Sequence, residues 1–173
     1  MADNMGNMGS GPRPATNGVM EAVNCVIYLM EKIPMSLILL FARIGVGAVF
    51  LVSAQTKVVD WSVIDALTFN LTLGDNTFVL FEYEYALPIL PFELAAYMAT
   101  YAESLLPLLL FVGLFTRFAA LALLGMTLVI QFLVYPGHWP EHAFWAGALL
   151  LIMARGPGIF SVEHWLGRAL AGR

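Results

Sequence analysis

The fold is decided by the stretch PMSLILLFARIGVGAVFLVSA, residues 34–54, in which Arg43 is the only charged residue. A helix needs about 20 predominantly apolar residues to cross a bilayer, and this stretch supplies them. A charged group at membrane depth is costly unless it is paired or solvated. The sequence therefore predicts a transmembrane helix over residues 34–54 that carries one buried cation.

Three further segments have a similar apolar character. Residues 92–113 carry Glu103 in their interior, residues 118–135 carry Gln131 near their far end, and residues 140–154 form a shorter run. Pro140 suits the first turn of that last helix, because its missing N–H has no partner there. Together with the first stretch, they predict an all-α membrane protein built as a four-transmembrane-helix bundle over residues 34–155.

The composition of the chain agrees with this class. Of its 173 residues, 60% are hydrophobic and 12% are charged, and the mean hydropathy is +0.81. Soluble domains carry about 25% charged residues, so this chain cannot cover a soluble surface. A net charge of −4 excludes a nucleic-acid partner, which would need clustered Lys and Arg. Cys25 is the only cysteine, which excludes an internal disulfide and a covalently attached c-type haem.

The distribution of basic residues predicts the orientation. Four spans leave only Lys57 on one side of the membrane. The other side holds the basic residues that remain outside the spans, namely Arg13, Lys32, Arg117, Arg155, Arg168 and Arg173. By the positive-inside rule, both termini are expected in the cytoplasm. The expected location is the inner (cytoplasmic) membrane of a bacterium, with lipid as a direct partner.

The segments that flank the bundle have patterns of their own. Residues 1–18 are rich in Gly, Asn and Pro, which predicts a disordered cytoplasmic tail. Residues 19–33 have helical apolar spacing and predict an amphipathic helix on the membrane surface; a cytosolic extension of the first span is the alternative. Residues 156–173 open with Gly-Pro-Gly and predict a cytoplasmic interfacial helix capped by Ser161.

The longest connection covers residues 55–91 on the outer side. Its residues 67–73 and 77–85 are rich in Phe, Thr, Val and Tyr and are separated by Gly-Asp-Asn. This pattern predicts a short β-hairpin or an extended cap over the mouth of the bundle. Long loops of this kind often serve as lids or binding loops, and a packing cap without a ligand is the alternative.

Arg43 and Glu103 are the two ionisable groups well inside the predicted spans. Each lies roughly 14–15 Å from the inner end of its span, at about 1.5 Å per residue. The two groups therefore sit at matching depth and can form a direct or water-bridged pair. Such a pair serves ligand or proton handling, or it only fixes the register of the helices.

A second polar layer is expected nearer the outer face. Gln55 and Lys57 close the first span, Gln131 approaches from the third, and His138 and His142 flank the fourth. Lys57 can also be an ordinary interfacial anchor. The two histidines invite a metal or haem interpretation, but Pro140 lies between them and breaks the i, i+4 helix face. No metal is therefore expected.

Several motifs resemble the DoxX family of small membrane proteins, and the likeness covers about residues 36–168. The matching motifs are Arg-Ile-Gly-Val-Gly at 43–47 followed by Lys57, Ala-Thr-Tyr-Ala-Glu at 99–103, Gly-Leu-Phe-Thr-Arg at 113–117, Tyr-Pro-Gly-His-Trp-Pro at 135–140 and Ala-Arg-Gly-Pro-Gly at 154–158. The resemblance implies a four-helix membrane bundle with cytoplasmic termini. It also implies an association with quinone-linked oxidation, because a related subunit belongs to a thiosulfate:quinone oxidoreductase.

The function that this resemblance implies is that of a membrane subunit of a quinone-linked oxidoreductase complex. Glu103 would take or deliver protons, while Arg43, Lys57 and Gln131 would hold the quinone oxygens. Gln55 would complete the polar layer, and His138 would connect the pocket to the outer face. Quinone would be bound without a covalent link, and the partner would be a protein that carries a redox cofactor, or another copy of this chain.

Two other functions stay open at this stage. A non-catalytic scaffold or assembly subunit would use the polar core only for structure. A small proton-coupled transporter would use the buried acid for coupling, and with four spans it would need to be a dimer.

Overall fold

A computed structural model describes residues 18–172, and everything described there is helical apart from turns and one isolated bridge. Three helices are long and apolar enough to cross a membrane: α2 (Met35–Gln55), α5 (Phe92–Val112), and α6 (Thr116–Val129) with its π-helical continuation η2 (Ile130–Val134). They confirm three of the spans expected from the sequence. α7 (Trp139–Arg155) covers the fourth predicted segment but has only 17 residues, and it does not meet the same criterion.

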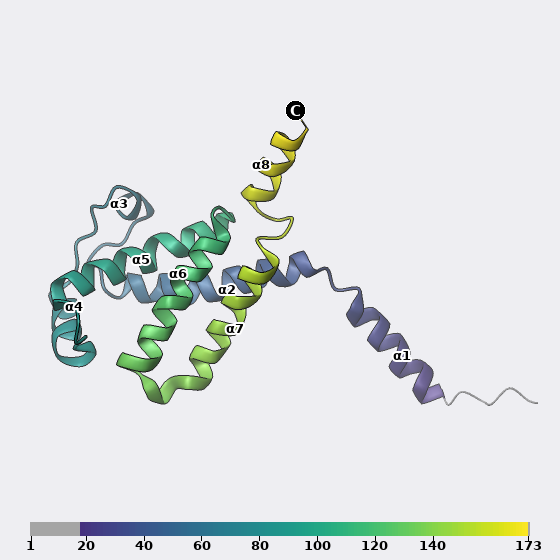
Figure 1. Ribbon diagram of the computed structural model, residues 1–173, viewed down its shortest axis with the longest axis horizontal. Helices are drawn as coiled ribbons and strands as arrows, with labels where there is room; N and C mark the ends of the chain where they lie inside the picture. The colour runs from purple at the N-terminus through teal and green to yellow at the C-terminus, as the bar shows by residue number, and fades with distance from the viewer. Residues whose placement is uncertain (1–17, 173) are drawn as a thin grey trace, which may run out of the picture. The chain divides into compact units, whose positions relative to one another are not determined.

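The four long helices pack in a ring. α2 lies against α5 and α7, and α6 lies against the same two helices, so that α5 and α7 occupy opposite corners (Figure 1). Short connections enforce this order. Gly113 ends α5 with a left-handed φ of 71°, which allows the following Leu114 N–H to donate to the Leu109 carbonyl at 3.0 Å, and α6 begins three residues after Gly113.

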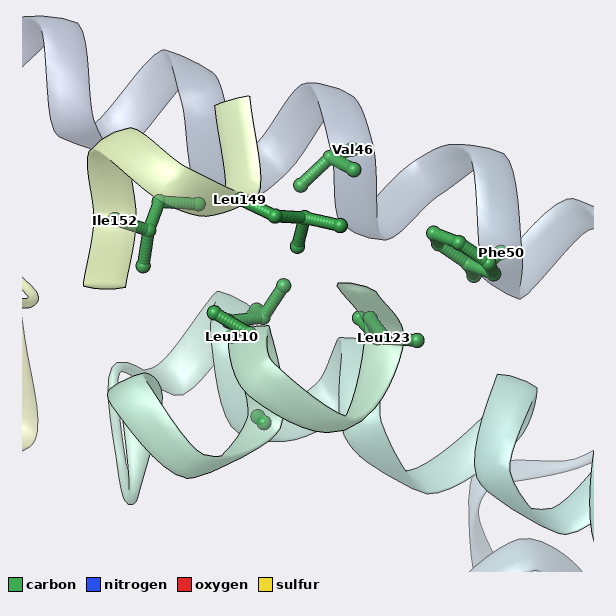
Figure 2. Packing of buried hydrophobic residues seen from close by; sticks show 8 residues of the cluster. Val46, Phe50, Leu110, Leu123, Leu149 and Ile152 are labelled. Atoms are coloured by element: carbon green, nitrogen blue, oxygen red, sulfur yellow. The ribbon is translucent and has the colours of Figure 1, made fainter. Parts of the chain in front are cut away.

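The centre of the ring is filled by aliphatic and aromatic side chains from all four helices. Figure 2 shows Val46 and Phe50 of α2 on one side of the cluster, with residues of the other three helices around them, namely Leu110, Leu123, Leu149 and Ile152. α2 and α5 approach closely because Gly47 has no side chain. A Cβ atom there would lie 2.6 Å from the Phe111 ring. Close helix contacts in lipid depend on such small residues.

The outer connection does not form the predicted β-hairpin. Residues 63–85 instead contain α3 (Val63–Leu67), α4 (Asp75–Val79) and the π-helix η1 (Leu80–Tyr85). Strand pairing in the described residues is limited to one isolated antiparallel bridge between Val58 and Leu73.

The hairpin prediction was wrong because its alternating pattern also fits a helix. Thr77, Phe81 and Tyr85 belong to the alternating series at positions 77 to 85, but they are also spaced four residues apart, which is about one helical turn. Thr77 and Phe81 are buried, whereas the intervening Val79 and Tyr83 are 55% and 75% exposed. Gly74, expected in the turn, instead precedes the first turn of α4. The segment packs on Ala95 and Ala96 of α5 through buried Leu71, Leu73 and Phe81.

Two further helices, α1 and α8, are not among the four helices of the ring. α1 (Gly18–Glu31) belongs to a separate unit that ends at Ile33, and its apolar side chains are exposed. α8 (Val162–Ala171) is capped as the sequence predicts, because the Ser161 side chain accepts a hydrogen bond from the His164 N–H. That these two helices lie on the membrane surface stays a prediction. Residues 1–17 of the predicted tail are outside the described residues.

Candidate functional site

A buried ion pair lies between α2 and α5. The Lys57 Nζ is 2.6 Å from the Glu103 Oε2, and the two side chains are only 3% and 6% exposed. Lys57 stands just beyond the end of α2, and its side chain reaches back to the Ser53 Oγ at 2.7 Å and the Ser53 carbonyl at 3.3 Å. Three donors of one ammonium group are thereby satisfied. Low exposure and full pairing make this a fixed polar centre within the membrane domain.

The outer connection holds Lys57 in place from above. The Thr77 hydroxyl donates to the Lys57 carbonyl at 2.7 Å, and the Gly74 N–H donates to the same oxygen at 3.0 Å. Thr77 is itself buried. The helical segment of residues 75–85 is therefore hydrogen-bonded directly to Lys57, the cation of the ion pair.

Arg43 does not pair with Glu103, contrary to the depth argument. Its Nη2 donates to the Phe160 carbonyl at 2.5 Å, and its Nη1 lies where a Cβ on Gly113 would be 2.2 Å away. Ser53 of α2 is level with Glu103, because both contact the Lys57 ammonium group, and Arg43 lies ten residues before Ser53. Gly113, which is next to Arg43, likewise lies ten residues after Glu103 in α5. At 1.5 Å per residue, Arg43 is therefore about 15 Å nearer the inner end than Glu103.

The reason for this difference is a stagger of the two helices. α2 and α5 are of equal length, but α2 extends past the inner end of α5, while α5 extends past the outer end of α2. Equal distances from the inner ends therefore do not give equal depths. Arg43 instead binds the Phe160 carbonyl just before α8. Glu163 in the first turn of α8 supplies a favourable negative charge and also accepts a hydrogen bond from the Thr116 N–H at 2.6 Å.

A cavity of about 710 Å³ opens beside the ion pair. Its walls are mainly apolar side chains of α2, α5, α6 and α7, among them Phe50, Met126 and Trp145. Glu103 and Ser53 supply polar atoms on one wall, and the outer connection contributes Phe81 and Tyr85. A mainly apolar cavity of several hundred Å³ with a few polar groups is the usual form of a small-molecule site.

The wall formed by α7 carries a second polar group. The His142 Nδ1 lies 2.7 Å from the Gln131 Oε1, and the Gln131 Nε2 donates to the Pro136 carbonyl at 2.9 Å. His142 is buried and lines the cavity together with the exposed His138, whose ring centroid lies 6.3 Å away. Gln131 does not line the cavity and acts through His142.

Tyr85 and Tyr135 also line the cavity. The Tyr135 hydroxyl donates to the Glu84 carboxylate, and the Tyr85 hydroxyl bonds to Tyr135. Burial raises the pKa of the Tyr85 hydroxyl, and the bond to Glu84 raises the pKa of Tyr135. Both phenols therefore keep their protons at neutral pH. The Tyr135–Glu84 bond ties the outer connection to the end of η2.

The structure brings together some of the predicted site residues and separates others. Glu103 and Lys57 are paired, His138 belongs to the facing wall, and Gln131 bonds His142 from behind that wall. Gln55 is exposed and does not line the cavity, and Arg43 belongs to the inner end. Within residues 18–172, no three His, Cys, Asp or Glu side chains gather as a metal ion would require.

Sequence reasoning missed two contributors to the site. Ser53 was not considered, although it lies four residues before Lys57, which is the spacing of one helical turn. The sequence marks Tyr135 only as the first residue of the 135–140 motif. Its bond to Glu84 spans 51 residues of sequence, and no local pattern signals such a contact.

Comparison with known families gives one match. The family model described as DoxX matches residues 38–136, which include Lys57, Glu103 and Gln131 and end two residues before His138. No curated protein and no solved structure matches the chain. The match covers more than half of the sequence and, with the three apolar helices, supports a multi-pass membrane location. The chain belongs to the DoxX family.

Proposed function

We propose that this protein is the membrane subunit of a quinone-linked oxidoreductase and that it binds a quinone in the cavity beside Glu103. The observation that carries this proposal is the charged pair at the wall of a mainly apolar cavity of about 710 Å³. A quinone has an apolar ring and tail and two polar oxygens. It matches a cavity with apolar walls and few polar atoms.

The roles of the charged residues follow from their contacts. Lys57 already uses its donors on Glu103 and Ser53, so it partners the Glu103 carboxylate rather than holding a quinone oxygen. Glu103 lines the cavity and is the group placed to exchange a proton with the ligand. His138, exposed at the other end of the cavity, is the outlet toward the aqueous phase.

The membrane arrangement that we propose has four spans, with α7 as the fourth. Its 17 residues extend for about 26 Å, slightly less than the hydrocarbon core. Neighbouring helices or local thinning of the bilayer can accommodate such a mismatch. The α5–α6 turn and the end of α7 carry Arg117 and Arg155, which favours cytoplasmic termini in a bacterial inner membrane.

The proposal can be tested by tryptophan fluorescence, because Trp145 is the one tryptophan among the described residues that lines the cavity. The full chain in nanodiscs would be titrated with duroquinone. Saturable quenching in the wild type, and its loss in Trp145→Phe, is the expected result. Trp139→Phe is the matched control, since Trp139 is exposed and outside the cavity lining.

The opposite result would favour a different role. If the saturable part of the quenching is absent, or survives in Trp145→Phe, quinone does not occupy this cavity. The Lys57–Glu103 pair would then be a structural element of a scaffold or assembly subunit.

A further inference from the structure

Two polar groups of the cavity, Glu103 and His142, lie at one level on opposite walls. The Phe50 and Trp145 rings are in contact, with centroids 5.6 Å apart, on the antiparallel helices α2 and α7. Ser53 lies three residues further out on α2, and His142 lies three residues further out on α7. Ser53 is also level with Glu103, because both contact the same ammonium group. Since α5 and α7 are at opposite corners of the ring, Glu103 and His142 approach a ligand from two sides.

Glu103 presents hydrogen-bond acceptors to the cavity. A carboxylate offers about four lone-pair positions. Lys57 uses one at Oε2, and the Ser53 hydroxyl supplies a second hydrogen bond. The remaining positions are available to a ligand, and an ionised carboxylate can only accept there.

His142 also presents an acceptor, and the reason is the orientation of Gln131. The Pro136 carbonyl can only accept, so the amide nitrogen of Gln131 must face it and the amide oxygen must face His142. That oxygen requires a proton on the His142 Nδ1. In the neutral imidazole the Nε2 then carries a lone pair and no proton. The Gln131–Pro136 contact thereby fixes which tautomer borders the cavity.

The hydroxyls of Tyr85 and Tyr135, which also line the cavity, do not offer a hydrogen-bond donor to a ligand. Tyr85 bonds to Tyr135, and Tyr135 donates to Glu84. Their protons are thus directed along a chain that leads to the outer connection. The Glu103 carboxylate and the His142 Nε2, which belong to opposite walls of the cavity, therefore both lack a proton to give.

From this geometry we infer that the cavity selects the quinol over the quinone, an inference that rests on the proposed function. A para-quinol carries a hydroxyl donor at each end of its ring and can bond Glu103 on one side and His142 on the other. A quinone presents a carbonyl oxygen at both ends and meets acceptors there. Tighter binding of the quinol raises the midpoint potential of the bound couple, by about 30 mV for each tenfold ratio of the dissociation constants.

The test compares the two redox forms of one ligand. Duroquinol, kept reduced under argon, and duroquinone would be titrated calorimetrically into the full chain in nanodiscs at pH 8, above the ordinary range of histidine titration. One charge-assisted hydrogen bond predicts at least about tenfold tighter binding of duroquinol.

Two variants address the acceptor on α7 independently. His142→Met removes the acceptor. Gln131→Met removes the amide oxygen that fixes the His142 tautomer, while the imidazole itself stays in place. Each should lower the quinol-to-quinone preference at least about threefold and change duroquinone affinity less than about twofold. Met126→Leu, which alters an apolar part of the same lining, is the matched control and should keep the preference.

The outcomes separate this inference from the proposed function. Equal affinities of the wild type for both forms, or an unchanged preference in both His142→Met and Gln131→Met, would overturn the inference and leave quinone binding standing. Failure of the wild type to bind either form would overturn both.

Discussion

The Lys57–Glu103 pair makes a quantitative prediction about stability. Replacing Lys57 by Met leaves the Glu103 carboxylate, whose side chain is 6% exposed, without its ammonium partner. It also removes the two hydrogen bonds to Ser53. Breaking a buried pair from one side costs about 3–5 kcal/mol, because the remaining charge stays buried. Glu103→Gln should cost a similar amount, since it strands the ammonium group.

The double variant distinguishes a true pair from two independent polar residues. Lys57→Met with Glu103→Gln removes both charges, so its loss should be well below the sum of the single losses, with a coupling of about 2–3 kcal/mol. Unfolding in mixed micelles of increasing SDS content would measure all three. Lys32→Met, an exposed lysine outside the bundle, is the control and should change stability by less than about 0.5 kcal/mol.

The same assay tests the helix register directly. Arg43 lies about 15 Å from Glu103 along the helix axes, and sites this far apart without shared partners add to within about 0.5 kcal/mol. Arg43→Met and Glu103→Gln should therefore be additive. Strong coupling between Arg43 and Glu103, together with additivity for Lys57 and Glu103, would refute the stagger of α2 and α5 from which the site is built.

Two further variants test the ends of the ring. Gly113→Ala forces alanine into a left-handed conformation and puts its methyl group 2.2 Å from the Arg43 guanidinium. The SDS midpoint of unfolding should therefore fall by the equivalent of at least about 2 kcal/mol. The control is Gly125→Ala, which changes a helical glycine with open space around it and should be neutral or stabilising. Tyr135→Phe removes the bond to Glu84 and should increase amide exchange across residues 80–91, by the equivalent of about 1–2 kcal/mol, without shifting the α5 amides. Because the folded pKa of Tyr135 is raised, this bond is present below the ordinary tyrosine pKa of about 10 and is lost as the pH rises beyond it; amide exchange measured against pH should show that sign.

The spans could be predicted from the sequence because a bilayer imposes a single strong requirement on them. α2 and α5 nearly coincide with the predicted residues 34–54 and 92–113. A sustained apolar run has few alternatives to a helix in lipid, and Pro34 marks the start of α2 while Gly113 marks the end of α5. The outer connection lies under no such requirement. There the period of four shared by Thr77, Phe81 and Tyr85 was hidden inside an apparent alternation.

The candidate site was predictable in its residue types but not in its pairing. Glu103 and Lys57 stand out as charges in or beside apolar segments, and that signal is local. Which cation meets Glu103 depends on the axial offset between α2 and α5. That offset is set by contacts such as Gly47 against Phe111, which join residues far apart in the sequence. Depth counted from one end of each span carries no information about it.

The offset also explains why one protein of this size carries two buried cations with different partners. Had α2 and α5 ended level, Arg43 could have met Glu103, and the cavity wall would lack a carboxylate with free lone pairs. With the observed stagger, Arg43 is held by the Phe160 carbonyl at the inner end. Lys57 reaches back over one helical turn to meet Glu103. The Thr77 hydroxyl bonds the Lys57 carbonyl, and the Lys57 ammonium group bonds Glu103. The stagger therefore joins the outer connection to the cavity wall through a chain of three hydrogen-bonded residues.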